Sequence, residues 1–378
     1  MPGILLVGET SFTGRKMNDS ISWKAREIEI LTLIAQGYTN SQIGAQLHLS
    51  YDTIRWYNKT IFEKLAVTNR QQAVHRATEL GLLETPSPTQ SQPAPEIIKS
   101  PIQYVANGNV HIAYQIVGDG PIDLLFIHGF LSHLELAWEN EEFSNFFAEM
   151  SRFARVILFD KRGVGLSDRI QGAPSLTDTV DDALCVLDAA QSKSAFVMGT
   201  SEGAATAVLL SSAHPERVLG LILFAAVAKV VRTGLEPAWA NEAKKFQTLI
   251  NQMQQGWGGA WAIEHFAPSK AQDDLFCHWW AMILRAASSP SSIKAVLEQL
   301  GEVDIRSLLP QVSVRALVIH KQADRITPLE AGRYFATHMP NATWLELPGA
   351  DHIYFVESTA VLKAIADFCQ SESKNVFK

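Results

Sequence analysis

The sequence has little of what marks secreted, membrane or metal-binding proteins. Its 378 residues include three cysteines, far apart and without a Cys-x-x-Cys pair, so neither a disulfide framework nor a cysteine zinc site is expected. No apolar run approaches the roughly 18 residues that a membrane helix needs, and the first residues lack the basic start of a signal peptide. No Gly-x-Gly-x-x-Gly or Walker pattern is present. We therefore expect a cytoplasmic protein with no metal, no cofactor and no membrane partner.

The chain also lacks the excess of positive charge that is typical of proteins that bind nucleic acid. The chain carries 32 Lys and Arg against 39 Asp and Glu, a net charge of −7. Residues 1–100 contribute +1 and the remainder −8, so neither part has a strongly basic footprint. The near-neutral first part still leaves DNA binding open. The length and the 47% apolar content predict a globular protein of two domains.

A proline-rich stretch separates two regions with different patterns. Residues 84–101 hold five prolines among Ser, Thr and Gln, which is typical of an extended linker. Residues 21–83 before it have helical patterning throughout, and residues 1–20 have no assignment. Residues 102–378 alternate short β-branched apolar runs with longer helical stretches, which predicts an α/β domain with a mostly parallel sheet.

The second region predicts eight strands and a helical insertion. A hairpin signal surrounds Gly108, and six further apolar runs lie at 123–128, 154–160, 194–199, 218–224, 315–320 and 343–348. Helices are expected at about 173–190, 201–213, 329–338 and 358–371. The helical residues 230–305 follow the sixth strand and are expected to form a cap over the carboxyl edge of the sheet, where open α/β folds bind ligands.

A serine motif follows the fifth strand candidate. Residues 199–203, Gly-Thr-Ser-Glu-Gly, match Gly-x-Ser-x-Gly between an apolar strand and an Ala/Leu-rich helix, which is the context of a nucleophile elbow. The glycines are needed because the turn is tight. Ser201 would project above the sheet at a helix N-terminus, whose dipole favours developing negative charge.

Two further strand ends supply partners for this serine. A serine hydroxyl needs a base, and the base needs an orienting carboxylate. Asp324 and His352 each lie four residues past an apolar run, in the order Ser, Asp, His and on the same predicted sheet edge as Ser201. We therefore expect a Ser201–Asp324–His352 triad. Asp351 is the rival acid, although its place next to His352 in the chain makes it less suited to face the imidazole.

Two backbone N–H groups are expected to form an oxyanion hole. Glu202, directly after the serine, supplies one, and Phe130, in the loop after the first long strand, supplies the other. His128 and Gly129 are expected to shape that loop and to border the substrate pocket. A purely structural role for His128 stays open.

These motifs resemble the α/β-hydrolase superfamily from about residue 102 to 370. The similarity rests on His-Gly-Phe at 128–130, the loop 159–168, the serine motif and the loops of Asp324 and His352, all in family order. The resemblance implies a serine hydrolase acting on ester bonds, and the loop together with Gly-x-Ser-Glu-Gly resembles hydrolase-like domains that bacteria join to regulatory domains. Glu202 would place an acid beside the nucleophile and so disfavour anionic substrates.

The cap candidate is rich in tryptophan. It holds five of the nine in the chain, Trp239, Trp257, Trp261, Trp279 and Trp280. Two interpretations stay open. The indoles are either ordinary core and lid packing or the wall of a pocket for an apolar acyl chain or ring.

The first region predicts four short helices that include a helix-turn-helix. The first is expected at about 24–36 and the third at about 51–65. The second begins at a capping box formed by Thr39 and Gln42 and ends near Leu47, and the fourth begins at a capping box formed by Thr68 and Gln71. The third helix has an apolar face for the core, formed by Ile54, Ile61 and Leu65. Its other face is polar and carries Arg55, Asn58, Lys59 and Lys64.

Residues 23–83 resemble the LuxR-type helix-turn-helix family. Matching residues include Arg26-Glu27, Ala35-Gln36-Gly37, Ile43-Gly44, Thr53-Ile54-Arg55 and Lys64-Leu65. The resemblance implies that Thr53, Arg55 and Lys59 contact double-stranded DNA, and that the protein binds it as a homodimer. A protein-interaction bundle is the alternative.

Together the motifs predict a transcription regulator. Its hydrolase domain would sense, and hydrolyse, a small ester- or lactone-like molecule. One alternative is a cytoplasmic serine esterase with a non-regulatory helix-turn-helix module. The other is a hydrolase-fold receptor without catalysis.

Overall fold

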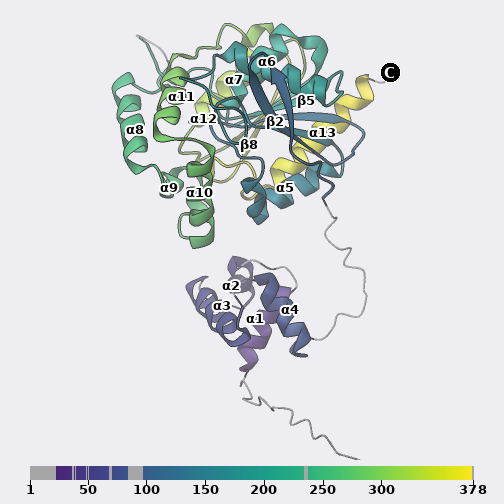
Figure 1. Ribbon diagram of the computed structural model, residues 1–378, viewed down its shortest axis with the longest axis vertical. Coiled ribbons are helices and arrows are strands. Elements are labelled where there is room, and N and C mark those ends of the chain that lie inside the picture. The colour runs from purple at the N-terminus through teal and green to yellow at the C-terminus, as the bar shows by residue number, and fades with distance from the viewer. Residues whose placement is uncertain are drawn as a thin grey trace, which may run out of the picture. The chain divides into compact units, whose positions relative to one another are not determined.

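The structure is a computed structural model that describes residues 23–35, 38, 40–47, 49, 51–67, 70–83, 97–233 and 237–376. The chain divides into two compact units between Pro93 and Ala94. We call the described residues of the first the four-helix unit and those of the second the sheet unit (Figure 1). No helix among the described residues is both long and apolar enough to span a membrane.

Four helices surround a small apolar core in the four-helix unit. They are α1 (Ala25–Ala35), α2 (Asn40–Leu47), α3 (Tyr51–Leu65) and α4 (Arg70–Glu79). Ile54, Ile61 and Leu65 of α3 are buried, as their helical spacing predicts. Thr39 and Thr68, the predicted helix caps, lie outside the described residues, as do residues 1–20.

A buried ion pair joins α1 to α3. Lys64 Nζ lies 2.6 Å from Glu27 Oε2, and the Glu27 side chain is 2% exposed. Burial alone would raise the pKa of Glu27, but the Lys24 N–H and the Lys64 ammonium hold it below its ordinary value. Asn58 Nδ2 donates to Asn40 Oδ1. Lys64 and Asn58, which the sequence analysis places on the polar face of the third helix, therefore bond within the unit instead.

An eight-stranded sheet with the order β1-β2-β4-β3-β5-β6-β7-β8 forms the centre of the sheet unit. Its strands are β1 (Gln103–Asn107), β2 (Val110–Val117), β3 (Asp123–Ile127), β4 (Arg155–Phe159), β5 (Ala195–Thr200), β6 (Val218–Phe224), β7 (Ala316–Lys321) and β8 (Ala342–Leu347). β2 pairs antiparallel with β1 and β4, and the other pairs are parallel. The parallel strands β3 to β7 are mainly apolar and are buried over most of their length, because helices cover both faces. This confirms the predicted α/β fold with a mostly parallel sheet.

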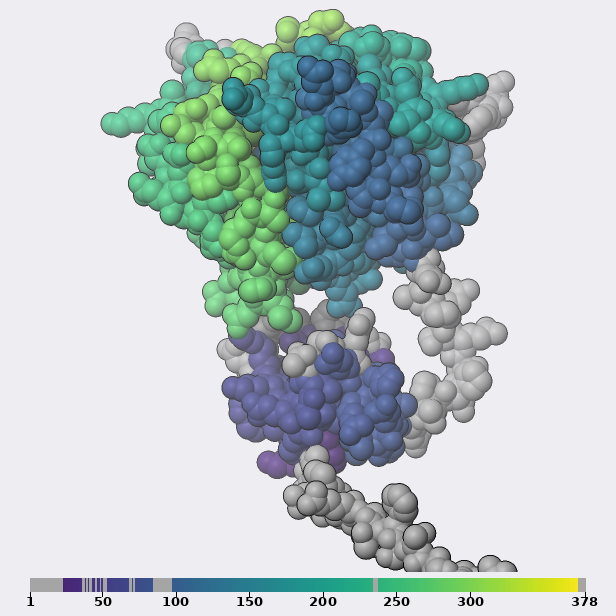
Figure 2. Space-filling view, in the orientation of Figure 1, coloured from purple at the N-terminus to yellow at the C-terminus, as the bar shows by residue number. Residues whose placement is uncertain are grey.

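Helices cover the two faces of the sheet, and a helical cap lies between β6 and β7. α5 (Glu141–Ser151) and α13 (Thr359–Val376) pack on one face, and α6 (Leu176–Ala189), α7 (Gly203–Ala213) and α12 (Leu329–His338) pack on the other. The cap contains α8 (Ala243–Gly256), α9 (Ile263–Phe266), α10 (Asp274–Ala287) and α11 (Pro290–Glu302). Short 3-10 helices lie at Leu136–Glu139, Pro215–Arg217, Pro268–Lys270 and Leu309–Gln311. In Figure 2 the green cap residues adjoin the teal and blue residues of the same unit as one continuous surface.

The sequence analysis predicts no helix at α5. The signal for it is present all the same. Asn140 caps the helix by accepting a hydrogen bond from the Phe143 N–H. Phe143, Phe146, Phe147 and Met150 are buried at helical spacing. Packing of this face against the sheet and α13 fixes the helix in place.

Candidate functional site

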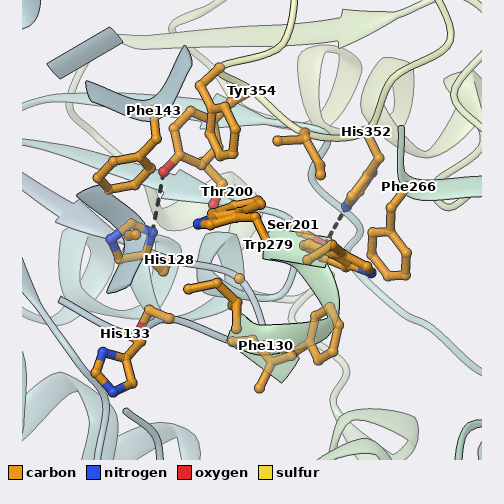
Figure 3. Close-up of a pocket in the computed structure, with 18 of the residues that line it drawn as sticks. His128, Phe130, His133, Phe143, Thr200, Ser201, Phe266, Trp279, His352 and Tyr354 are labelled. Atoms are coloured by element: carbon orange, nitrogen blue, oxygen red, sulfur yellow. Dashed lines mark hydrogen bonds between the residues drawn. The ribbon is translucent and has the colours of Figure 1, made fainter. Parts of the chain in front are cut away.

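Ser201 occupies a sharp turn between β5 and α7. Its φ of 51° lies in the left-handed region, which non-glycine residues rarely adopt. A Cβ at Gly203 would lie 2.4 Å from the His128 carbonyl oxygen, and one at Gly199 would lie 2.8 Å from Ala204 Cα. Both glycines are therefore required by close packing, and the turn carries the Ser201 side chain at the carboxyl end of β5 (Figure 3).

Ser201, His352 and Asp324 form a continuous chain of hydrogen bonds. Ser201 Oγ lies 2.8 Å from His352 Nε2, and His352 Nδ1 lies 2.8 Å from Asp324 Oδ2. The other carboxylate oxygen of Asp324 accepts from the N–H groups of Ile326 and Thr327. The three side chains follow β5, β8 and β7, so they meet because these parallel strands end at the same edge of the sheet.

The charge of Asp324 fixes the direction of these hydrogen bonds. Burial alone would raise its pKa, but His352 and the Thr327 N–H hold it below its ordinary value, so the carboxylate is ionised at neutral pH. An ionised carboxylate only accepts hydrogen bonds. His352 therefore donates from Nδ1, and its Nε2 accepts the Ser201 hydroxyl proton.

Asp351, the rival acid, faces the cap and not the imidazole. Its carboxylate accepts from the Ser269 N–H at 3.0 Å and from the Ser269 hydroxyl at 2.8 Å. The neighbouring N–H groups of His352 and Ile353 both donate to the Phe266 carbonyl oxygen. The loop that carries the imidazole is thus attached directly to the cap.

The loop after β3 passes close to the serine. A Cβ at Gly129 would lie 3.4 Å from Ser201 Cβ. Within the described chain, neither the Phe130 N–H nor the Glu202 N–H donates to a protein acceptor. Glu202 is the N-cap residue of α7, so its N–H lies at a helix N-terminus. Both predicted N–H groups are therefore without an acceptor in the described part of the chain.

The Glu202 carboxylate is neutralised by a buried lysine. Lys161, just after β4, forms an ion pair with it, and the Lys161 side chain is 5% exposed. The Glu202 charge is therefore paired within the protein, and the expectation that Glu202 disfavours anionic substrates stays a prediction. The sequence analysis does not single out Lys161. The strand order β4-β3-β5 is the feature that brings the two residues together.

A cavity of about 790 Å³, including its mouth, opens beside Ser201. His128, Gly129, Phe130, Trp279 and Trp280, all predicted for the site, line it. Further lining residues that the sequence analysis does not single out include Leu134, Phe143, Phe266, Ile283, Tyr354 and Phe355. Figure 3 shows how aromatic side chains from the cap, from α5 and from the His352 loop converge on Ser201.

Three of the predicted pocket tryptophans do not line this cavity. Trp239 packs against Tyr334 of α12, with ring centroids 5.5 Å apart and the rings tilted, beside the core on the other face of the sheet. Trp257 donates from Nε1 to the Ser288 carbonyl oxygen at the end of α10. The indoles of Trp239 and Trp257 therefore pack against the protein, in agreement with the packing interpretation.

Trp261 also lies outside the lining. Its ring packs 6.2 Å from that of Phe266, and Phe266 is the residue that reaches the cavity. The Trp261 carbonyl oxygen accepts a hydrogen bond from Trp280 Nε1. Trp279 and Trp280 of α10 do line the cavity, so the pocket interpretation stays a prediction for these two indoles.

His128 is an uncharged histidine at the cavity. Burial, and secondarily the Lys161 ammonium, lowers its pKa to about 3. Its Nδ1 lies 3.4 Å from the Tyr354 hydroxyl oxygen (Figure 3). Burial raises the pKa of Tyr354 well above its ordinary value, so the pair is neutral.

In the four-helix unit, α3 presents cations to solvent. Arg55 and Lys59 are exposed, Thr53 is half-buried, and Arg55 and Lys59 share one face of the helix because they lie four residues apart. Trp56 beside them is 57% exposed. Exposed cations on a helix can contact the phosphates of a nucleic acid.

Two family models match this chain. The model described as alpha/beta hydrolase fold matches residues 124–359. The model described as bacterial regulatory proteins, luxR family, matches residues 24–77. The two matches fall in the sheet unit and the four-helix unit respectively.

Individual relatives agree with the larger match. A pimeloyl-[acyl-carrier protein] methyl ester esterase of Chromobacterium violaceum is 26% identical over 276 residues, which are 70% of this chain and 100% of that protein. The 3-oxoadipate enol-lactonase 2 of Acinetobacter baylyi is 29% identical over 202 residues, 53% of this chain and 73% of that one. The bromoperoxidase structure from Bacillus anthracis shares the fold, with a TM-score of 0.61 and 20% identity over 71% of this chain and 100% of that one. The protein therefore belongs to the α/β-hydrolase fold family and also carries a luxR-family regulatory domain.

Proposed function

We propose that this protein is a DNA-binding transcription regulator whose sheet unit hydrolyses a small ester or lactone, with Ser201 as nucleophile. The hydrogen-bonded chain from Ser201 through His352 to Asp324, beside an apolar cavity, is the observation that carries the enzymatic half. Relatives named as an esterase and an enol-lactonase support ester chemistry. The luxR-family match and the exposed cations of α3 support DNA binding, in the cytoplasm and as a homodimer.

In the first half of the reaction, Ser201 Oγ attacks the carbonyl carbon of the substrate while His352 Nε2 takes the hydroxyl proton. Asp324 keeps the imidazole in the required tautomer and stabilises the imidazolium. The N–H groups of Phe130 and Glu202, with the N-terminal end of α7, stabilise the oxyanion that forms. His352 then protonates the leaving alcohol oxygen, and an acyl ester of Ser201 remains.

Water completes the reaction. His352 removes a proton from a water molecule, whose oxygen attacks the acyl carbon. The bond to Ser201 Oγ breaks, and His352 returns a proton to the serine. The products are a carboxylic acid and an alcohol, which remain parts of one molecule when the substrate is a lactone.

Labelling with a fluorophosphonate probe tests the nucleophile. Wild type and Ser201→Ala are compared by intact mass after identical exposure. We expect a single adduct on wild type and none on the variant, because only a serine activated by its base attacks the phosphonate. A wild type that is folded by circular dichroism and stays unlabelled would reject the enzymatic half.

A gel-shift experiment tests the regulatory half. The full chain is mixed with DNA from upstream of its own gene and with a random fragment of equal length. We expect a retarded band on the upstream fragment at protein concentrations that leave the random fragment free. Absence of binding to every fragment would reject a regulatory role and favour the esterase alternative.

A further inference from the structure

The cavity beside Ser201 has no charged side chain in its wall. Among the nineteen residues that line it, none is Lys, Arg, Asp or Glu. The Lys161–Glu202 ion pair lies outside this lining, with the Lys161 ammonium bound to its partner. Asp324 is fully buried behind the imidazole that it binds. A charged ligand would therefore find no counter-ion in the wall.

Most polar groups at the cavity are already bonded to the protein. Trp279 and Trp280 donate their indole N–H groups to backbone carbonyls of the loop before α5 and of the cap. The Ser132 hydroxyl donates to the buried carboxylate of Asp160. These residues turn aromatic and aliphatic surface toward the cavity and keep their donors away from it.

Two histidines lie across the cavity from His352 (Figure 3). His133 Nδ1 accepts the N–H of Leu136 at 3.3 Å. His128 is buried against Tyr354 and has its pKa lowered to about 3, so it supplies no charge at neutral pH. Both rings can exchange hydrogen bonds with a neutral polar group.

We propose that the cavity takes an electrically neutral ester or lactone with an apolar acyl part and discriminates against the same ester bearing a carboxylate. This inference rests on the proposed function. Its physical reason is that an ionised group transferred from water into a site without a counter-ion loses hydration that nothing replaces. Hydrolysis adds water across the ester and yields a carboxylate, so the reaction converts a ligand that the cavity favours into one that it disfavours.

A matched pair of substrates tests the inference. Phenyl hexanoate and monophenyl adipate share the leaving group and a six-carbon acyl chain, and only the adipate ends in a carboxylate. We expect kcat/KM at pH 7.5 to be at least about 100-fold higher for the hexanoate. Equal values, or a preference for the adipate, would overturn the inference and leave the proposed hydrolysis intact.

A binding measurement separates this inference from the proposed chemistry. Ser201→Ala is titrated with each ester, and binding is followed by tryptophan fluorescence, since Trp279 and Trp280 line the cavity. We expect the hexanoate to bind at least about tenfold more tightly. If both esters bind equally, the cavity does not select on charge, whatever the wild type hydrolyses.

Adding a cation to the wall should narrow the preference for the hexanoate over the adipate. Ile283→Lys places an ammonium on the cavity side of α10, since Ile283 lines the cavity. Leu275→Lys is the control on the same helix, because Leu275 is 83% exposed and outside the lining. We expect Ile283→Lys to narrow the hexanoate preference at least about tenfold and Leu275→Lys to leave it unchanged. A preference that is unchanged in a folded Ile283→Lys variant contradicts the inference.

Discussion

The two proposed binding surfaces of this chain differ in charge. α3 exposes Arg55 and Lys59 to solvent, whereas the wall of the Ser201 cavity has no charged side chain among its lining residues. Binding of a polyanion by exposed cations weakens as salt rises. Binding of a neutral ligand in an apolar cavity has no such dependence. One chain can therefore respond to two ligands through forces that do not compete.

The largest expected effect compares two neighbouring acids of the sheet unit. Asp324→Asn removes the acceptor that orients His352 and should lower kcat/KM about 10⁴-fold. Asp351→Asn keeps an acceptor for Ser269 and should lower it less than about tenfold. Steady-state hydrolysis of phenyl hexanoate by both variants is the measurement. A larger loss of kcat/KM with Asp351→Asn than with Asp324→Asn would show that Asp351, and not Asp324, orients His352.

The second effect belongs to the four-helix unit. Glu27→Gln removes the carboxylate that pairs with the partly exposed Lys64 ammonium and should destabilise the unit by about 2 kcal/mol. Glu29→Gln on the same helix removes only an exposed pair with Arg26 and should cost less than about 0.5 kcal/mol. Hydrogen exchange of α1 and α3 amides in the full chain measures both. Unchanged protection in Glu27→Gln would show that the buried pair adds nothing.

The third effect is a pH dependence of the sheet unit. The pKa of His128 is about 3 in the folded chain against 6.5 for an ordinary histidine, so below pH 6.5 the unfolded chain binds a proton that the folded chain does not. Unfolding free energy therefore falls as pH drops from 6.5 toward 3. His128→Gln should reduce the fall between pH 7 and pH 4.5 by about 2 kcal/mol in urea titrations.

A surface histidine serves as the control for that experiment. His75 of α4 is exposed, and His75→Gln removes one histidine without touching the cavity. Its urea titrations should retain the fall seen in wild type. If His75→Gln and His128→Gln behave alike, burial of His128 is not the origin of the acid sensitivity.

The smallest effect concerns DNA. Arg55→Ala should weaken binding to the upstream fragment about tenfold and lower the slope of log K against log salt by about 1, while ester hydrolysis stays unchanged. Arg76→Ala is the matched control, because Arg76 lies on α4 and pairs with Glu79. Fluorescence anisotropy at three salt concentrations reads both variants. An equal loss in the two would show that overall charge, and not the α3 face, sets affinity.

Much of the sheet unit follows from local sequence patterns. Buried parallel strands are continuous apolar runs, and the two glycines around Ser201 mark a turn that only small residues fit. Asp324 and His352 could be chosen because they follow strands that end at one edge, which converts chain order into proximity. Helix α5 is missing from the prediction, although its Asn140 cap and its apolar spacing are both present in the sequence.

The remaining features depend on tertiary packing. The Lys161–Glu202 pair joins residues 41 positions apart, and only the placement of β3 between β4 and β5 brings them together. The composition of the cap left ordinary packing and an aromatic wall both open. It could not separate Trp279 and Trp280 from the other three indoles, because which indoles reach the cavity depends on how the cap helices pack on the sheet.

The bonds from His352 and Ile353 to the Phe266 carbonyl have a pharmacological consequence. Phe266 lines the cavity, so a ligand bulky enough to displace it also shifts the backbone of the imidazole that must accept the serine proton. The size of the ligand then decides whether it is hydrolysed or stays bound without being hydrolysed. We expect small esters to act as substrates that are consumed on binding, and bulky ones as inhibitors that stay bound. Residence times measured for a graded series of acyl esters would show this as dwell times that lengthen while turnover falls.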